Sequence, residues 1–353
     1  MIKVTKNSKI YIAVPANLET GGPEELHQLG EALNNMGLNA FIYYTPINHP
    51  SPVRPAYKKY KVPFLNNIND DPDNILIIPE SFDHAIFFNK FPKVQKLLWW
   101  MSVDNFYIYY YLKTRRNIKN FVFRAVNKMS RSIIKNPVID FSETAMKIYK
   151  GVDLSNEMIV PKVDLHLFQS DYAKHNLLKN GLTNIKHLCG YLDDGFFPYD
   201  YKIDSKEDIV LFNPKKGFKF TKKIISSAPN IKFLPIQNMS RQEVINMMKK
   251  AKVYIDFGNH PGKDKMPREA AICGCCVITG KRGSAAFYQD VPLSDKYKFE
   301  DKEENIPKIV DTIRYCINNH KEAIKDFDEY REVIKKEKDR FIEDLRGIFL
   351  NQI

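Results

Sequence analysis

The stretch HPGKDKMPREAAICGCCVITG (260–280) opens with a charged turn, continues into a helix of small residues and ends in an apolar run. The segment before it, KVYIDFGN (252–259), is another short apolar run bounded by polar residues. Short apolar runs of this kind are typical of the buried strands of a parallel sheet. The whole stretch therefore predicts strand, helix and strand in succession, which is the repeating unit of an α/β fold.

The same alternation extends in both directions along the chain. An irregular stretch, YLDDGFFPYDYKIDSKED (191–208), is interrupted by glycine and proline and separates two sets of strands. The strands that we expect span 9–16, 39–44, 75–80, 96–103, 164–170 and 185–192 in the first set, and 208–214, 231–236, 252–259 and 275–280 in the second. The prediction is an α/β protein of two Rossmann-like parallel-sheet domains, 1–195 and 196–353, which face a cleft and end in a charged helical tail.

Composition limits the classes of protein and partner. The chain has 353 residues, enough for two domains, and an apolar fraction of 44% excludes wholesale disorder. Lysine and arginine outnumber acids by 54 to 42, and the net charge of +12 favours an anionic partner: a nucleic acid, a phosphate-bearing small molecule or an acidic membrane. No apolar run is long enough to span a bilayer, and the first residues lead into a strand without a cleavage site, so we expect a cytoplasmic protein.

The five cysteines also favour a cytoplasmic protein. Three of them crowd together at Cys273, Cys275 and Cys276, too close for an ordinary disulfide framework and without the ligand spacing of a zinc site. We expect small, buried, reduced thiols there and no metal.

Ligands of parallel α/β sheets bind beyond the carboxyl ends of the strands, so the loops at those ends are the candidate sites. In the loop ETGGPEE (19–25), Gly21 and Gly22 would let the backbone approach a ligand at the start of a helix whose first residue is Pro23. The alternative is a tight strand-to-helix turn. The chain has neither a dinucleotide fingerprint nor a GxxxxGK[ST] phosphate loop.

A second strand-end loop, FNPKKG (212–217), carries two lysines. Lys215 and Lys216 are the kind of cations that would offset the charge of a diphosphate, and the alternative is a solvated basic turn.

The third loop is the charged turn of 260–280. If Pro267 is the first helical residue, Glu269 is about the third, where the helix dipole keeps a carboxylate ionised and able to accept hydrogen bonds from two ribose hydroxyls. Lys263 and Arg268 at the same helix start suit phosphate, and together these features describe a nucleotide. The candidate donor-binding residues of this loop are His260, Gly262, Lys263, Asp264, Arg268 and Glu269. The alternative is that Glu269 only stabilises its own helix and that the cations are solvated.

The segment MPREAAICGCCVITG (266–280) resembles the donor-site signature of GT-B glycosyltransferases, of the large retaining group 1 that is similar to family 4. AVPANLETGGPEELHQLGEALNNMG (13–37) is similar to that family's glycine loop and first helix, and NPKKG (213–217) matches the position of its basic pair. The resemblance covers most of 9–290. It implies a nucleotide-sugar donor bound mainly by the C-terminal domain, an acceptor held by the N-terminal domain, and Glu269 in contact with the ribose.

Two departures from the family pattern concern the chemistry. The family usually has another glutamate eight positions before Glu269, where this chain has Pro261, and His260 or Asp264 would have to replace it. The donor sugar, and the choice between retention and inversion, therefore stay open. The family's N-terminal histidine is also not evident; in WWMSVDN (99–105), Asp104 is the candidate catalytic group that orients the acceptor or acts as a base. The alternative for Asp104 is a helix or turn cap.

The stretch 111–137 contains eight lysines and arginines and no acid, with apolar residues between them. Such a pattern predicts a helix on an anionic membrane surface. A nucleic-acid contact, or an ordinary helix with one buried face, would give the same pattern. Beside a sugar-transfer site, a lipid-linked acceptor and a peripheral position at the inner membrane face fit best.

The prediction is thus a glycosyltransferase that moves a sugar from a nucleotide-sugar donor to a glycan or lipid-linked acceptor in surface polysaccharide or glycolipid synthesis. We find no Asp-x-Asp metal motif in the strand-end loops, so we expect metal-independent transfer without a cofactor. Three alternatives remain. A sugar-nucleotide epimerase of the same build would turn over its nucleotide sugar without an acceptor, and a non-catalytic nucleic-acid-binding protein would show strongly salt-dependent binding. A catalytically inactive scaffold is the third. No nucleic-acid partner is expected.

Overall fold

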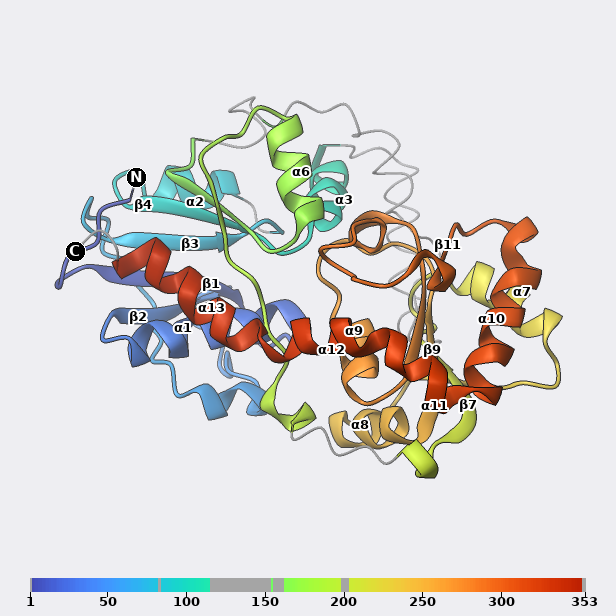
Figure 1. Ribbon diagram of the computed structural model, residues 1–353. Helices are drawn as coiled ribbons and strands as arrows, with labels where there is room; N and C mark the ends of the chain where they lie inside the picture. The colour runs from blue at the N-terminus through green and yellow to red at the C-terminus, as the bar shows by residue number, and fades with distance from the viewer. Residues whose placement is uncertain (1, 82–83, 115–153, 155–161, 198–202, 351–353) are drawn as a thin grey trace. The chain divides into compact units, whose positions relative to one another are not determined.

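A computed structural model describes residues 2–81, 84–114, 154, 162–197 and 203–350 of the chain. The chain divides into two compact units (Figure 1). The first contains the described residues up to 191 together with the segment from 338 onward, and the second contains the described residues from 192 to 337. Each unit is built around one parallel sheet, as predicted.

The sheet of the first unit has the strand order β2-β1-β3-β4-β5-β6. Every neighbouring pair is parallel; for example, Ile10 of β1 lies opposite Ala40 of β2 and Ile75 of β3. The strands are β1 (Lys9–Pro15), β2 (Asn39–Thr45), β3 (Ile75–Pro79), β4 (Gln95–Trp100), β5 (Leu165–Phe168) and β6 (Ile185–His187). The helices between them include α1 (Gly21–Asn35), α2 (His84–Lys90), α3 (Val103–Thr114) and α6 (Asp171–Lys179).

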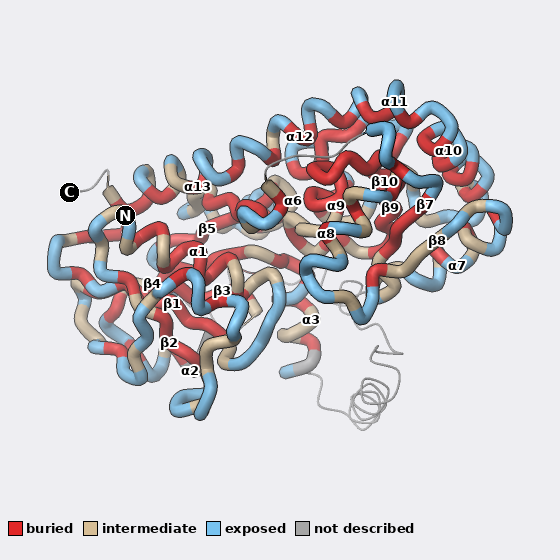
Figure 2. The backbone as a smooth tube through the Cα atoms, turned by 90° about the horizontal axis from the view of Figure 1, so that it is seen from below, coloured by how far each residue is buried: buried red, intermediate tan, exposed pale blue. Residues whose placement is uncertain are grey.

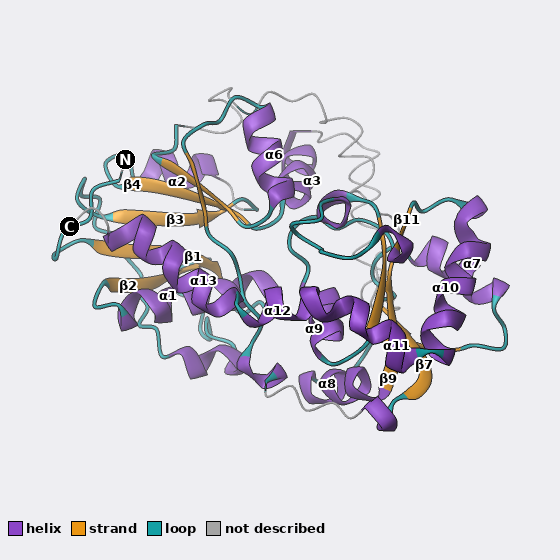
Figure 3. Cartoon of the chain, in the orientation of Figure 1, coloured by secondary structure: helices purple, strands orange, loops and turns teal. Residues whose placement is uncertain are grey.

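The sheet of the second unit has the order β11-β10-β9-β7-β8, again all parallel. Its strands are β7 (Glu207–Phe212), β8 (Lys232–Pro235), β9 (Ala251–Asp256), β10 (Cys276–Gly280) and β11 (Lys298–Phe299). Its helices include α7 (Phe218–Ser227), α8 (Arg241–Lys250), α9 (Lys265–Ile272), α10 (Ile306–Asn318), α11 (His320–Ala323) and α12 (Asp328–Lys335). In both units helices flank the sheet (Figure 3), and the strands form the buried centre while the outer helix faces are exposed (Figure 2).

Local sequence signals explain several helix starts. α8 begins with a capping box, in which the side chains of Ser240 and Glu243 each accept a hydrogen bond from the other's backbone N–H. α1 begins at Gly21, so Pro23 is its third residue and not its first. Proline is tolerated at either place because the first four N–H groups of a helix have no partner within it.

The charged tail departs from the prediction that it belongs to the second domain. α13 (Glu337–Leu345) continues into a short π-helical turn (Arg346–Leu350), and the chain from 338 onward packs on the first unit. Phe341, Leu345, Ile348 and Phe349 are buried in the same apolar core as residues of β1 and α1. An amphipathic helix buries its apolar face wherever a matching surface exists, and here that surface is on the first unit.

Three further predictions concern the cysteines, membrane-spanning segments and the basic stretch. All five cysteines are free and buried, including Cys273, Cys275 and Cys276, for which burial was predicted. No helix in the described part of the chain combines the length and apolarity needed to cross a membrane. Most of the basic stretch 111–137 lies outside the described residues.

Candidate functional site

The loops after β7 and β9 meet through two glycines. Gly217 has a φ of +59°, and a Cβ there would lie 2.0 Å from the carbonyl oxygen of Phe257. Gly258 has a φ of +101°, and its Cβ would lie 2.7 Å from the Cα of Gly217. Neither position accepts a side chain, because the backbones touch. This contact brings the residue before Gly217 against the end of β9.

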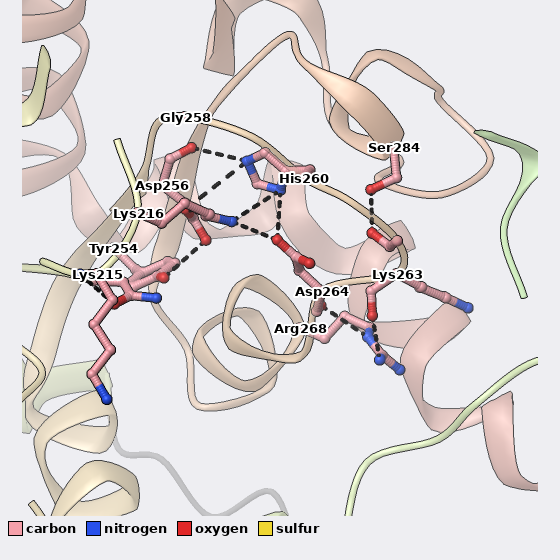
Figure 4. Close-up of polar contacts among 12 residues, drawn as sticks. Lys215, Lys216, Tyr254, Asp256, Gly258, His260, Lys263, Asp264, Arg268 and Ser284 are labelled. Atoms are coloured by element: carbon pink, nitrogen blue, oxygen red, sulfur yellow. Dashed lines mark hydrogen bonds and ion pairs between the residues drawn. The ribbon is translucent and has the colours of Figure 1, made fainter. Parts of the chain in front are cut away.

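That residue is Lys216, and its ammonium lies among three side chains (Figure 4). Its Nζ is 2.8 Å from Oδ1 of Asp256, 2.5 Å from Oδ2 of Asp264 and 3.4 Å from Nδ1 of His260. Asp256 and His260 are buried, and the hydroxyl of Tyr254 donates to the other oxygen of Asp256 at 2.9 Å. We call Lys216, Asp256, His260 and Asp264 the lysine cluster.

The charges in the lysine cluster stabilise one another. Burial alone would lower the pKa of Lys216, but the carboxylates of Asp256 and Asp264 outweigh it and raise that pKa. Burial would likewise raise the pKa of Asp264, but Lys216 and His260 hold it well below its usual range. The cluster therefore contains an ammonium and an ionised Asp264 at neutral pH, both partly buried.

Three members of the lysine cluster also have the chemistry of metal ligands. One ligand atom from each of Asp256, His260 and Asp264 lies within 4.8 Å of the others. Lys216 contacts all three groups, so the chain itself supplies a cation at this place.

The loop that contains Pro261 is fixed from the other side by a short 3-10 helix, Gly283–Ala286. Ser284 donates its backbone N–H to the carbonyl of His260 at 2.9 Å and its hydroxyl to the carbonyl of Gly262 at 2.5 Å. Gly283 has a φ of +61°, and a Cβ there would lie 2.0 Å from the same carbonyl of His260. Gly262 thus contributes a backbone acceptor that positions the loop.

Lys263 and Arg268 are paired away from the lysine cluster. Their side chains lie 2.8 Å from the two carboxylate oxygens of Glu337, and Arg268 also donates to the carbonyls of Lys263 and Asp264. Arg268 is fully buried. Both cations therefore neutralise a buried acid and fix the turn before α9, which is a structural role that the sequence analysis did not consider.

Glu269 is also paired within the second unit. α9 begins at Lys265, so Pro267 is its third residue and Glu269 its fifth; the predicted first and third places are wrong. The buried carboxylate accepts a hydrogen bond from Nη1 of Arg241 at 2.8 Å. The guanidinium of Arg241 lies 4.4 Å from the ring centre of Phe196, and its side chain is 45% exposed.

Lys215 does not join the lysine cluster, although it is the neighbour of Lys216. It is exposed, and Figure 4 shows its side chain extending away from His260. Its backbone N–H donates to the side chain of Asn213 at 3.0 Å, which shapes the turn. The two lysines that the sequence presents as a pair are therefore in different environments.

In the first unit, Gly21 and Gly22 are the first two residues of α1, and Thr20 before them makes no side-chain cap. Among the described residues, a Cβ at Gly22 would meet the side chain of Met101 alone, at an ordinary 3.7 Å. Packing within the chain therefore does not require glycine at position 22.

Asp104 lies in the first turn of α3 and is buried. Its carboxylate accepts a hydrogen bond from the hydroxyl of Tyr172 at 2.6 Å. Burial, followed by the charge of Asp104, raises the pKa of Tyr172. This contact joins α3 to α6, which is a structural role other than the cap that was the alternative for Asp104.

A different acid of the first unit, Glu80, was not singled out in the sequence. It follows β3 directly, is buried, and accepts a hydrogen bond from the backbone N–H of Met101 at 3.0 Å. Burial raises the pKa of Glu80 to about 8, against the lowering effect of that hydrogen bond. Glu80 is therefore largely protonated at neutral pH. An acid directly after a buried strand was its only sequence signal.

Comparison with known proteins gives limited similarity in sequence and extensive similarity in fold. No protein-family model matches the chain. It is 28% identical over 134 residues to a curated alpha-1,6-glucosyltransferase of Actinobacillus pleuropneumoniae serotype 7 (strain AP76). That match covers 36% of this chain and spans only 40% of the length of the relative.

Among solved structures, Anabaena HepE in complex with UDP and glucose matches with a TM-score of 0.59 at 10% identity, over 98% of this chain and 100% of that one. S. aureus TarM, a variant of which is known with fondaparinux, alpha-GlcNAc-glycerol and UDP, matches with a TM-score of 0.52 at 14% identity, over 80% of this chain and 56% of that one. Sucrose-phosphate synthase from Thermosynechococcus elongatus matches with a TM-score of 0.51 at 12% identity, over 97% of this chain and 100% of that one. The two units thus have the GT-B architecture that the sequence predicted.

Proposed function

We propose that this protein is a glycosyltransferase that moves a sugar from a nucleotide-sugar donor to a glycan or lipid-linked acceptor. The observation that carries the proposal is the similarity in fold to HepE, which extends over nearly all of both chains. HepE is known in complexes with UDP, with UDP and glucose, and with UDP-glucose. The sequence match to an alpha-1,6-glucosyltransferase supports the same activity.

The lysine cluster would bind the donor diphosphate. It lies at the carboxyl ends of β7 and β9, where ligands of parallel sheets bind. A departing nucleoside diphosphate gains negative charge, and a positioned ammonium stabilises that charge most effectively where water is excluded. Lys216 would leave the carboxylates of Asp256 and Asp264 to contact the diphosphate. Because this cation belongs to the chain, we expect transfer without a metal ion.

Glu269 would accept hydrogen bonds from the ribose hydroxyls. Its carboxylate is held in one place by Arg241, and the half-exposed guanidinium could move aside or add a contact to the nucleotide. We propose a uridine nucleotide with glucose as the donor, since UDP or UDP-glucose is bound in several of the similar structures. The fondaparinux and alpha-GlcNAc-glycerol in the complex of the TarM variant support a glycan acceptor.

The basic stretch 111–137 would hold the enzyme on an anionic membrane near a lipid-linked acceptor. This part of the proposal is supported by the sequence alone, in which eight cations and no acid occur. Each cation contributes about 1 kcal/mol near such a surface. Replacing Arg115, Arg116 and Lys119 by glutamate should release the protein from phosphatidylserine vesicles in co-sedimentation, and equal sedimentation of variant and parent would contradict this part.

The activity is tested with UDP-glucose, with and without a mixture of glycan acceptors, in the presence of EDTA. We expect UDP release that depends on the acceptor and persists in EDTA. Conversion of the nucleotide sugar without any acceptor would favour an epimerase. The proposal would be contradicted if neither UDP release nor conversion of the nucleotide sugar occurred and UDP did not stabilise the protein. A ligand at 100 times its Kd should add about 2.7 kcal/mol to the free energy of unfolding.

A further inference from the structure

A separate cavity in the second unit has the properties of a ligand site. It has a volume of about 350 Å³, which is within the range of small-molecule sites. It lies beyond the carboxyl end of β10 and beside β11, and it is lined by Lys281, Ala286, Tyr288, Leu293, Ser294, Asp295 and Lys298. We call it the β10–β11 pocket.

Lys298 is the unusual member of this lining. It is 94% buried, since only 6% of its surface is exposed. Its hydrogen bond to the described residues is a long one, 3.5 Å from Nζ to the carbonyl of Phe287, and no carboxylate of the described part of the chain forms an ion pair with it. Leaving an ammonium buried with so little compensation is costly. Burial lowers the pKa of Lys298 to about 8, so the amine is still mostly charged at pH 7.

Two lysines and one acid line the pocket. Lys281 lines the same cavity and lowers the pKa of Lys298, whereas Asp295 and Asp290 raise it. Asp295 is already paired with Lys281 at 2.9 Å and is largely exposed. An oxyanion in the cavity would find the buried ammonium of Lys298 and a second ammonium on Lys281, whose partner Asp295 is exposed. Tyr288 and Leu293 offer apolar surface to the rest of such a molecule.

The β10–β11 pocket shares no lining residue with the lysine cluster. The 3-10 helix Gly283–Ala286 contacts both: Gly283 and Ser284 touch the loop at His260 and Gly262, whereas Ala286 lines the pocket. The two places are therefore distinct sites on opposite ends of one short helix.

We propose that the β10–β11 pocket binds a small organic anion, recognised through its phosphate or carboxylate group by Lys298 and Lys281. A charge-assisted hydrogen bond to this anion would replace the compensation that Lys298 lacks within the chain. The site is independent of sugar transfer, because none of its residues belongs to the proposed donor site.

Competitive labelling of the whole protein tests the proposal. Lysines are acetylated with a limiting amount of an N-hydroxysuccinimide ester at pH 8, and the rate at each lysine is read by mass spectrometry with and without inorganic phosphate or citrate. At about four times its Kd, the bound anion should slow labelling of Lys298 and Lys281 about fivefold, because only the free site reacts. Lys296, which is exposed and pairs with Asp326, is the internal control and should not change.

Protection by phosphate alone would identify a phosphate site, and protection by citrate alone a carboxylate site. Equal labelling of Lys298 with and without both anions would overturn the proposal. So would a Lys298 that is never labelled, because the pocket would then be closed to small molecules.

Two variants separate binding at Lys298 from a general salt effect. Lys298→Met should abolish the protection of Lys281, whereas the matched Lys296→Met should leave it intact. Protection of Lys281 that survives in Lys298→Met would contradict the role of the buried lysine. Should Lys298→Met fail to fold, the labelling of the parent protein decides alone.

Discussion

The ammonium of Lys216 lies 2.8 Å from the carboxylate of Asp256, and this contact joins the carboxyl ends of two neighbouring strands, β7 and β9. It depends on the touching backbones of Gly217 and Gly258, which bring the two loops together. The contact therefore has a structural role and, in the proposed function, a role in binding the donor, and the two roles can be tested separately.

Lys216→Met should destabilise the second unit by about 3–5 kcal/mol, because it leaves the buried carboxylate of Asp256 and the partly buried carboxylate of Asp264 without their cation. The exposed neighbour supplies a matched control: Lys215→Met should change the free energy of unfolding by no more than about 0.5 kcal/mol. Urea unfolding followed by far-ultraviolet circular dichroism measures both. Equal stability of the two variants would show that the lysine cluster contributes nothing to folding.

Asp264→Asn should strengthen the binding of UDP severalfold, because it removes one of the two carboxylates that compete with a diphosphate for Lys216. Uridine, which has no phosphate, should bind the variant and the parent equally. Calorimetric titration of both ligands against both proteins gives the comparison. Weaker binding of UDP by the variant would mean that Asp264 helps the donor and does not compete with it.

Glu269→Gln should weaken the binding of UDP by about 1.5–3 kcal/mol, the usual contribution of hydrogen bonds to a charged group. The loss should nearly vanish for 2′,3′-dideoxyuridine diphosphate, which has no ribose hydroxyls to offer. The ion pair to Arg241 requires its own control, because Glu269→Gln breaks that pair as well. If Arg241→Met reproduces the loss for both nucleotides, the ion pair and not the ribose contact explains the effect.

Glu80 should make the first unit less stable as the pH rises. Its folded-state pKa of about 8 is above the ordinary value of 4.5, so the folded state keeps a proton that the unfolded state has released between these values. Stability should fall across that window by up to about 1.4 kcal/mol per pH unit. Both tryptophans, Trp99 and Trp100, lie in β4, so their fluorescence reports on this unit alone.

Glu80→Gln removes the titrating proton and keeps the size of the side chain. Measured by tryptophan fluorescence in urea, it should stabilise the first unit relative to the parent at pH 8.5 more than at pH 5. A stability difference between variant and parent that is the same at both values would refute the assignment of the proton to Glu80.

Phe341→Ala should destabilise the first unit by about 3–5 kcal/mol, the usual cost of truncating a buried phenylalanine. Phe341 is 1% exposed in the core of that unit although it lies far along the chain. Glu343→Ala, at an exposed position of the same helix, is the control. If Phe341→Ala leaves the unfolding midpoint measured by tryptophan fluorescence unchanged, the packing of α13 on the first unit is contradicted.

The fold was largely predictable because buried parallel strands are short, apolar and separated by helices. β11 was missed since a two-residue strand, Lys298–Phe299, has no periodicity to detect. The placement of the tail was also missed. The spacing of its apolar residues shows that α13 buries one face, but not which core receives it.

The candidate site was predictable in its residue types and not in their pairings. Lys215 and Lys216 are indistinguishable in sequence, yet a glycine contact directs only one of them into the lysine cluster. Lys263 and Arg268 were predicted to suit phosphate, with solvation as the alternative, because their partner, Glu337, is distant in the chain. Asp256 at the end of a predicted strand was a signal that could have been used, whereas nothing in the sequence linked Arg241 to Glu269.

The packing of the segment from 338 onward against β1 and α1 has a consequence for biosynthesis. The ribosome makes the strands of the first unit early, but the residues that complete their core, among them Phe341 and Phe349, are translated only after all of 192–337. The second unit, by contrast, has its entire sheet in one continuous piece of chain. During translation the second unit can therefore finish folding first. Part of the apolar surface of the first unit stays exposed until α13 and the turn after it have been translated.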